Sequence, residues 1–272
     1  MPYPLSEVLS VAERLWPTAG AEGWDAPGLV TGSPTQSVSS IHLVVDAVAE
    51  SLDEAIAAGA DLVIAHHPLL LRGVKSVAET HYKGATIAKL IRSGTALLSA
   101  HTNADVVAEG TSAVLAEKLG LTGIRPIVPS AETGTGIGRV GTLTDAVSLG
   151  RLARTVAELL PPTAGGVRVA GSFDRSMLTV AVCGGAGDSL LSEPAVLAAD
   201  VYITADLRHH PASEAREQHL LGVGPALIDV SHWASEWLWL DTAAAQLRQA
   251  LPEASVTVSD VRTDPWDFAI VH

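Results

Sequence analysis

The chain of 272 residues is poor in cysteine, in aromatic side chains, in basic residues and in long apolar runs. Its single cysteine, Cys183, cannot form a disulfide within the chain, which fits a reducing compartment. No segment has the roughly 18 uninterrupted apolar residues of a membrane span, and the first residues lack the basic flank and apolar run of a secretory signal. We therefore expect a cytoplasmic protein that no membrane holds.

Basic residues are outnumbered, with 17 Lys and Arg against 30 Asp and Glu, so the formal net charge is −13 at pH 7. Proteins that follow nucleic-acid phosphates rely on clustered Lys and Arg, so the charge disfavours a nucleic-acid-binding ring. A small anionic substrate stays compatible with this charge if a bound cation supplies the local positive field.

Hydrophobic residues, in contrast, make up 47% of the chain, enough for one large core or two modest ones. Apolar residues at helical spacing over residues 5–16, followed by Pro17, predict a first helix. Ser51 and Glu54 have capping-box spacing, which predicts that a short helix begins there and stops at Gly59.

Predicted strands alternate with predicted helices along the rest of the chain, which indicates βαβ crossovers. The strands are expected at residues 40–48, 61–67, 95–101, 139–143, 167–171, 178–185, 200–205, 225–231 and 255–261. Periodicity is lost over residues 125–138, where Pro, Gly, Ser and Thr accumulate. We expect the α/β class: two similar α/β domains with mostly parallel or mixed sheets. The first spans residues 1–125, completed by residues 232–272, and the second spans residues 126–231.

Two sequence echoes link the halves. The segment "DLVIAHHP" resembles "DVYITADLRHHP", each an Asp-led strand that closes on polar residues. The segment "TALLSAHTNAD" ends in His101 and Asp105, and "PALIDVSHWASE" ends in His232 and Glu236, with the same His-x-x-x-acid spacing. In open parallel sheets, ligands collect just outside the carboxyl ends of the strands. All of these polar residues fall at such ends.

Imidazole and carboxylate are ligands of first-row metals such as Zn, Mn and Fe, and a carboxylate can bridge two ions. Three to four histidines with two to three carboxylates suffice for a pair of ions about 3.5 to 4 Å apart. The residue types therefore predict a two-metal hydrolytic site.

Each histidine also has an ordinary structural explanation. A lone His at a strand end is more often a hydrogen-bonded or surface residue than a ligand. The neighbours His66 and His67 would point to opposite faces of a straight strand, so both can ligate only if the strand ends or kinks there, as Pro68 allows. His209 is expected only to be exposed.

Other candidates have structural alternatives as well. Asp105 and Glu236 can be acids at helix N-termini, and Asp206 with His210 can form a loop hydrogen bond. The stretch "CGGAGDSLL" can present backbone N–H groups to a phosphate, but a tight turn needs the same glycines. Cys183 in that stretch is expected to be a small core residue rather than a nucleophile.

Seven segments together resemble a known family. In order they are "WDAPGLVTG", "HHPLLLRGVKS", "HTNAD", "GTGIGRVG", "TADLRHH", "SHWASE" and the terminal "DPWDF". Over nearly its whole length the chain is similar to the Nif-three-like dinuclear-metal proteins, many of which carry the name GTP cyclohydrolase 1 type 2 homologue. It departs in having Ala205 and "SHW" (231–233) where the family usually has Gly and Gly-His-Tyr. The short junction at 125–138 resembles the compact form, without the inserted middle domain.

The resemblance implies a two-domain subunit in a toroidal homohexamer, with a dinuclear site in the cleft between the domains. By position, the implied metal ligands are His66, His67, Asp105, His232 and Glu236. The resemblance places His101, Asp206 and His210 close to the site, where they orient ligands, water or substrate. The cofactors would be two divalent ions per subunit, with Zn, Fe, Mn, Ni and Mg all admissible.

Two functions of different class follow as hypotheses. In the first, the protein is a metal-dependent hydrolase of GTP, of another nucleotide-like compound or of another small molecule. It would use a metal-activated water, with His101 or Asp206 moving the proton. In the second, it is a non-catalytic metal-binding, metal-delivery or scaffold ring. An open coordination position would distinguish them, because structural sites are closed by protein ligands and catalytic sites keep water.

Overall fold

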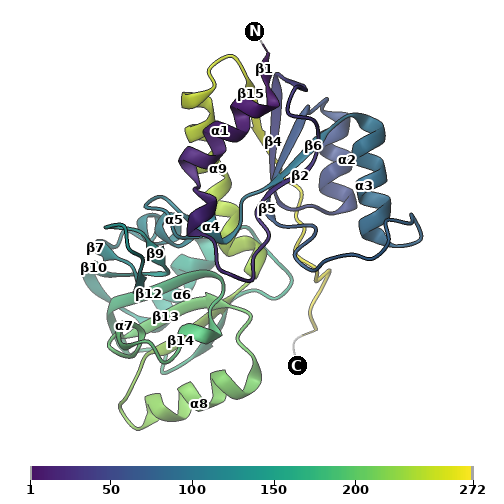
Figure 1. Cartoon of the computed structure of the whole chain (residues 1–272). Coiled ribbons are helices and arrows are strands. Elements are labelled where there is room, and N and C mark those ends of the chain that lie inside the picture. The colour runs from purple at the N-terminus through teal and green to yellow at the C-terminus, as the bar shows by residue number, and fades with distance from the viewer. Residues whose placement is uncertain (1, 271–272) are drawn as a thin grey trace. The chain divides into compact units, whose positions relative to one another are not determined.

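A computed structural model describes residues 2–270 of the chain and confirms the α/β class (Figure 1). The chain divides into two compact units. The first consists of Met1–Ala104 with Leu240–Thr263, and the second of Asp105–Trp239 with Asp264–His272. Each unit is built around one mixed sheet whose middle strands are parallel.

The first unit has a five-stranded sheet in the order β15-β4-β5-β6-β2. Its parallel strands are β15 (Ser255–Val258), β4 (Ser40–Asp46), β5 (Leu62–His67) and β6 (Ala96–Ser99). The antiparallel edge strand is β2 (Gly28–Thr31). The helices are α1 (Leu5–Leu15), α2 (Ala49–Ala57) and α3 (Tyr82–Ser93), and β1 (Tyr3–Pro4) pairs with β3 (Ser37–Val38). Figure 1 shows α2 and α3 together on one side of the sheet.

Strand β5 lies in the middle of this sheet, which explains its apolar run. Leu62, Val63, Ile64 and Ala65 are at most 1% exposed, because neighbouring strands and packed helices cover both faces. The side of the sheet that includes Val63 and Ala65 packs with Leu52 of α2 and Leu90 of α3 in one core cluster. The packing of this strand therefore sets the position of the histidines at its carboxyl end.

The second unit has a six-stranded sheet in the order β11-β14-β13-β12-β10-β7. Its parallel strands are β12 (Ser176–Ala186), β13 (Val201–Ala205) and β14 (Ala226–Val230). Its antiparallel strands are β11 (Arg168–Ala170), β10 (Arg139–Ser148) and β7 (Thr122–Arg125). The helices are α5 (Thr111–Lys118), α6 (Leu149–Leu159), α7 (Pro194–Leu197) and α8 (His209–Leu220), and β8 (Val128–Pro129) pairs with β9 (Gly136–Ile137).

Four elements complete the order along the chain. The short helix α4 (Thr102–Asp105) follows β6, the long helix α9 (His232–Ala250) follows β14, and two single 3-10 turns lie at Thr18–Gly20 and Asp188–Leu190. Along the described residues, no helix combines the length and the apolar character that crossing a membrane requires.

The two sheets share one arrangement. In each, three strands that are consecutive along the sheet run parallel in chain order, β4-β5-β6 in the first and β12-β13-β14 in the second. The echo of "DLVIAHHP" in "DVYITADLRHHP" thus equates β5 with β13, and the His-x-x-x-acid echo equates β6 with β14. The polar residues of both echoes follow the carboxyl ends of equivalent strands.

Some local predictions are wrong. The helix expected to begin at Ser51 begins at Ala49, so Ser51 is its third residue and accepts a hydrogen bond from the Val48 backbone N–H at 3.3 Å. Glu54 is used elsewhere: it contacts His42, with Oε2 3.1 Å from Nε2. The stop at Gly59 is confirmed, with φ +72° at that residue. Strand β2 is absent from the strands expected from the sequence, and its pairing with β6 orders it.

Candidate metal site

Three histidine rings meet at the carboxyl ends of β5 and β6 in the first unit. His66 and His67 end β5, and His101 follows β6, which runs parallel beside β5. The ring centroids form a nearly equilateral triangle: 5.1 Å for His66–His67, 5.2 Å for His66–His101 and 5.4 Å for His67–His101. One nitrogen of each ring lies within 4.8 Å of the others, so the three can hold a metal ion. We call these residues the histidine cluster.

The strand end expected at the paired histidines is confirmed. His67 is the last residue of β5, and it is also the last residue in register with β4, opposite Asp46. His66 is fully buried, and its Nδ1 donates to the Ala100 carbonyl at 2.9 Å. The neighbouring rings are tilted by 48° rather than turned to opposite sides.

All three rings of the cluster use Nδ1 in the same way. Besides the His66 bond, the Nδ1 of His67 lies 2.7 Å from Asp46 Oδ1, and that of His101 lies 2.8 Å from Asp25 Oδ1. Because a carbonyl or carboxylate oxygen can only accept, each Nδ1 must carry a hydrogen. In the neutral ring, Nε2 then presents its lone pair, the tautomer that ligates metals when an oxygen acceptor fixes the other nitrogen.

Asp25 holds His101 most firmly. Its side chain is completely buried and accepts four hydrogen bonds, from the Ala26 N–H (2.7 Å), His101 Nδ1 (2.8 Å), the Thr102 N–H (3.0 Å) and the Thr102 hydroxyl (2.5 Å). Burial alone would raise the pKa of Asp25, but the bonds from Thr102 and His101 lower it below its ordinary value of 3.8. The carboxylate is therefore charged at neutral pH and keeps His101 oriented.

Asp46, the last residue of β4, orients the ring of His67 as Asp25 orients that of His101. One carboxylate oxygen accepts from His67, and the other accepts from the Thr263 hydroxyl at 2.5 Å. The acceptor is thus itself fixed, by a residue more than two hundred positions away along the chain.

A second group lies in the second unit, where α9 begins. His232 Nε2 is 3.1 Å from Glu236 Oε1, one helical turn away, and its Nδ1 donates to Asp206 Oδ2 at 2.8 Å. Burial alone would lower the pKa of His232, but the carboxylates of Glu236 and Asp206 raise it to about 11. The two carboxylates thus create a strong local preference for a cation.

Asp206 follows β13 in an uncommon backbone conformation. Its φ of 54° is the one positive value among the described residues other than glycine. Short polar side chains such as Asp tolerate the left-handed region, but at a cost that neighbouring structure must offset. This conformation accompanies the contact of its carboxylate with His232.

Glycine makes room for Glu236. Gly185, near the end of β12, has φ +70°, and a Cβ there would lie 2.3 Å from Glu236 Oε1 and 3.1 Å from His232 Nε2. The residues "CGGA" (183–186) end strand β12, and Gly185 donates its backbone N–H to the Ser235 hydroxyl at 2.9 Å. One of the glycines that suggested a phosphate cradle therefore admits a carboxylate to this site.

Asp105 ends α4, and its Oδ1 accepts from the Thr111 hydroxyl at 2.5 Å. Glu236 is the fifth residue of α9, beyond the first turn, so the helix-terminus explanation does not account for it. Cys183 is buried, and burial raises its pKa to about 12, which agrees with a core residue rather than a nucleophile.

His210 belongs to neither of these groups. It stands in the first turn of α8, exposed, with its ring centroid 5.2 Å from that of His209, which is also exposed as expected. Among the residues that the structure describes, no group able to hold a metal includes His210.

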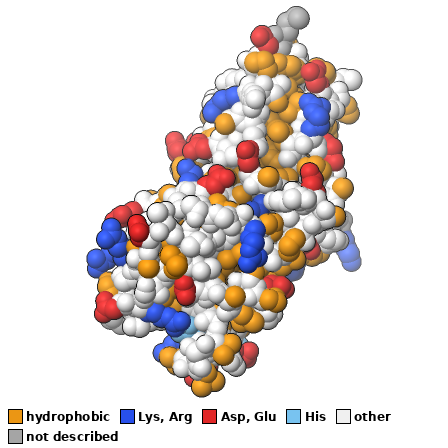
Figure 2. Space-filling view, turned by 90° about the vertical axis from the view of Figure 1, so that its left-hand side faces the viewer, with side chains coloured by type: hydrophobic (Ala, Val, Ile, Leu, Met, Phe, Trp, Pro, Cys, Tyr) orange, Lys and Arg blue, Asp and Glu red, His pale blue; other side chains and the backbone are white. Residues whose placement is uncertain are grey.

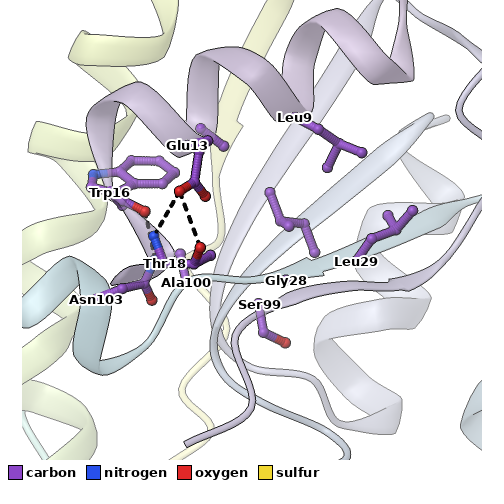
Figure 3. Close-up of a pocket in the computed structure, with 11 residues that line it drawn as sticks. Leu9, Glu13, Trp16, Thr18, Gly28, Leu29, Ser99, Ala100 and Asn103 are labelled. Carbon is purple, nitrogen blue, oxygen red and sulfur yellow. Dashed lines mark hydrogen bonds between the residues drawn. The ribbon is translucent and has the colours of Figure 1, made fainter. Parts of the chain in front are cut away.

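A cavity of about 210 Å³ lies between α1 and the β2–β6 edge (Figure 3). Its lining includes Ala100, which accepts from His66, and Asn103. Asn103 ties α1 to the cluster: its Nδ2 donates to the Trp16 carbonyl at 2.7 Å, and its Oδ1 accepts from the His101 N–H at 2.9 Å. The segment after β6 is thus held on both sides.

Sequence reasoning missed Asp25 and Asp46 as partners of histidines. Asp46 closes the apolar strand "SIHLVVD", the same signal that singled out the histidines at the end of β5. Asp25 lies in a polar loop, and no spacing relates it to His101, 76 positions later.

Two mixed sheets with histidines and carboxylates near the carboxyl ends of their strands define an α/β protein with residues that could hold a metal ion. Residues 3–265 match the Duf34/NIF3 (NGG1p interacting factor 3) family, and the chain belongs to this family.

Two relatives in sequence carry the same name. A GTP cyclohydrolase 1 type 2 homolog of Streptomyces coelicolor is 46% identical, covering 96% of this chain and 93% of the relative. One from Clostridium perfringens is 30% identical, over 97% and 99%. In fold, the chain resembles a hypothetical protein of Staphylococcus aureus, with a TM-score of 0.88, 25% identity and coverage of 99% and 100%. A Bacillus cereus protein related to NIF3 also has a TM-score of 0.88, at 23% identity over 97% and 99%.

Proposed function

We propose that this protein is a dinuclear metal-dependent hydrolase that acts on GTP or another nucleotide-like or small substrate. The proposed ligands of two divalent ions are His66, His67, Asp105, His232 and Glu236. The proposal includes a cytoplasmic protein that forms a toroidal homohexamer, as the family resemblance implies.

The observation that carries the metal assignment is the common state of the histidines together with their grouping. Each of His66, His67, His101 and His232 has its Nδ1 bonded to an oxygen acceptor, at 2.7 to 2.9 Å. The buried His219 also has Nδ1 bonded to a carbonyl, that of Gly224 at 3.0 Å, so this bond alone does not mark a ligand. The four differ in that three of them form the histidine cluster and His232 lies beside Glu236, and imidazole with carboxylate fits the donor set of Zn, Mn, Fe, Ni or Mg sites.

Bound divalent ions would polarise the bond to be attacked and lower the pKa of water towards neutrality. The chain's own residues then have separate tasks. Asp46 orients His67, and Asp206 orients His232, each by accepting at Nδ1. The carboxylates of Asp105 and Glu236 are suited to bridging because each has two oxygens.

Proton transfer is assigned to His101 or Asp206, and His210 is assigned to substrate contact. His101 is the stronger candidate for the proton, because ionised Asp25 stabilises its charged form at Nδ1 while Nε2 exchanges the proton. Asp206 is 59% exposed, so it can also meet a substrate from solvent.

The substrate class comes from the relatives, which are named for homology to a GTP cyclohydrolase. A purine nucleotide carries the anionic phosphates that a cation site attracts in a protein of net charge −13. Figure 2 shows Lys and Arg dispersed among acidic and apolar side chains on one face, which fits a small substrate better than a nucleic acid on that face.

The test begins with elemental analysis of the purified protein, where we expect close to two metal ions per chain. Asp105→Ala and Glu236→Ala should each lose metal while the oligomer persists in light scattering. His81→Ala, which changes an exposed histidine before α3, is the matched control and should keep both ions. Full metal content in a variant that lacks His66, Asp105 and His232 would refute the ligand set.

Activity needs a separate measurement. Metal-reconstituted protein is incubated with GTP and with a panel of phosphate esters and amides, and the products are separated by chromatography. Turnover that disappears in Glu236→Ala and persists in His81→Ala supports the hydrolase. Bound metal without ligand-dependent turnover would favour the alternative, a metal-delivery or scaffold ring.

A further inference from the structure

The motif "GTGIGRVG" has no part in the proposed chemistry, yet it contains a buried arginine. Arg139, the first residue of β10, is 2% exposed. Burial lowers its pKa, and the negative charge of Asp105 acts in the opposite direction. A guanidinium keeps its charge even so, and a charge placed in a core needs well-formed hydrogen bonds.

The guanidinium group of Arg139 makes three hydrogen bonds, all to backbone carbonyls. One terminal nitrogen donates to Gly136 at 2.6 Å and to Gly138 at 2.8 Å, and the other donates to Val107 at 2.6 Å. The planar guanidinium therefore joins its own turn to the segment that follows Asp105.

A second bond runs between the same two segments. The Gly136 N–H donates to the Val106 carbonyl at 2.7 Å. Gly136 has φ +143°, and a Cβ there would lie 2.2 Å from the Val128 carbonyl oxygen, so this close approach depends on glycine. Two consecutive carbonyls, one and two residues after Asp105, are thus fixed from the motif.

The side chain of Asp105 is fixed from the other direction by Thr111, whose hydroxyl donates to Oδ1 at 2.5 Å. Backbone and side chain of Asp105 are therefore constrained independently. The guanidinium charge also attracts the carboxylate.

We propose that Arg139 is a positioning residue for Asp105: its buried guanidinium holds the loop after Asp105 so that the carboxylate can serve a divalent cation. The inference rests on the proposed function, because it takes Asp105 to be a metal ligand. It assigns the "GIGR" turn of the motif to the metal site without any contact between that turn and the ion.

The test is a double-mutant cycle with Co²⁺ as the probe, because its visible absorption reports ligand number and geometry. Arg139→Met should weaken Co²⁺ binding about 10- to 100-fold and alter the absorption bands, the usual effect of removing a group that orients a ligand. Arg139→Lys keeps the charge but cannot reach all three carbonyls, so its loss should be smaller. Arg125→Met, on the exposed neighbouring strand β7, is the control and should bind Co²⁺ like the unchanged protein.

The cycle is closed with Asp105→Asn. If Arg139 acts through Asp105, adding Arg139→Met to Asp105→Asn should weaken binding by less than about twofold more, because interacting residues are not additive. Losses that multiply would overturn the inference, as would unchanged Co²⁺ affinity and spectrum in a folded Arg139→Met protein. If that protein does not fold, Arg139→Lys is carried through the same cycle and read in the same way.

The same binding measurements distinguish a failure of the proposed function from a failure of the inference about Arg139. If the unchanged protein binds no Co²⁺, or if Asp105→Asn alone has no effect, the ligand assignment fails whatever Arg139 does. Hydrogen exchange of peptides over residues 105–111 gives a readout without metal, and it should be faster in Arg139→Met than in Arg125→Met. Equal exchange in the two variants would count against the positioning role.

Discussion

Replacing Asp25 with Asn changes one side chain at the histidine cluster while keeping its shape. In the protein, both carboxylate oxygens accept, and the four donors come from Ala26, His101 and Thr102. The amide of Asn offers one acceptor oxygen and one NH₂ group. If the oxygen keeps the bonds from Ala26 and His101, the NH₂ group faces the donors of Thr102.

The expected loss of stability comes from the hydrogen bonds that Thr102 donates to Asp25. The Thr102 hydroxyl can rotate, but its backbone N–H at 3.0 Å cannot, so at least one buried donor loses its acceptor. Such a loss costs about 1–3 kcal/mol. Local opening should become more frequent by about five- to 150-fold, since each 1.4 kcal/mol is a factor of ten.

The assay is native-state hydrogen exchange by mass spectrometry on peptides that contain residues 22–26 and 100–104, with elemental analysis of the same samples. Faster exchange should be confined to these peptides, and the metal content should stay that of the unchanged protein because His101 is not among the proposed ligands. Asp53→Asn is the matched control: Asp53 is 63% exposed and pairs with Lys89 at the surface, where such pairs contribute little. If the two variants exchange alike in these peptides, the reasoning is refuted.

Three further predictions concern glycines and the cysteine. Gly84→Ala in α3 would place a Cβ 2.2 Å from the Ala78 carbonyl, so the free energy of unfolding should fall by about 1–3 kcal/mol, with a lower melting temperature. Gly73→Ala is the control and should melt like the unchanged protein, because a Cβ there has nothing within 4 Å. Gly185→Ala should displace Glu236 and weaken metal binding in a titration, and equal affinity in Gly165→Ala and Gly185→Ala would contradict this role. The thiol of Cys183 should resist iodoacetamide at pH 8 in the folded protein and react in denaturant, since a pKa of about 12 keeps it protonated; rapid labelling of the native protein would show that the site opens.

Much of the local structure could be predicted because it depends on near neighbours in the chain. Pro17 lies just beyond helix α1, and Gly59 and Gly94 take positive φ just beyond α2 and α3, as their positions after periodic segments indicate. The same holds for β5, whose apolar run marks a strand buried on both faces and whose end places His66 and His67. The echo between the halves also identified the equivalent strands, because sheet order follows chain order in both.

Spacing failed where a side chain had more than one possible partner. Ser51 and Glu54 matched a capping box, yet Ser51 caps from inside the helix and Glu54 contacts His42 and Ser259. The short strand β2 was not among the expected strands, because its pairing with β6 is long-range and its own residues do not alternate between apolar and polar.

The sequence by itself determined the class of the fold, the strand ends that carry histidine and carboxylate, and the family. Only the tertiary structure decided which oxygen holds each ring: Asp25 for His101, Asp46 for His67, and the Ala100 carbonyl for His66. It also decided that Arg139 binds the loop after Asp105. The reason is physical, since helix and strand patterns repeat over a few residues, whereas these hydrogen bonds join residues 21 to 76 positions apart that the packed sheets bring together.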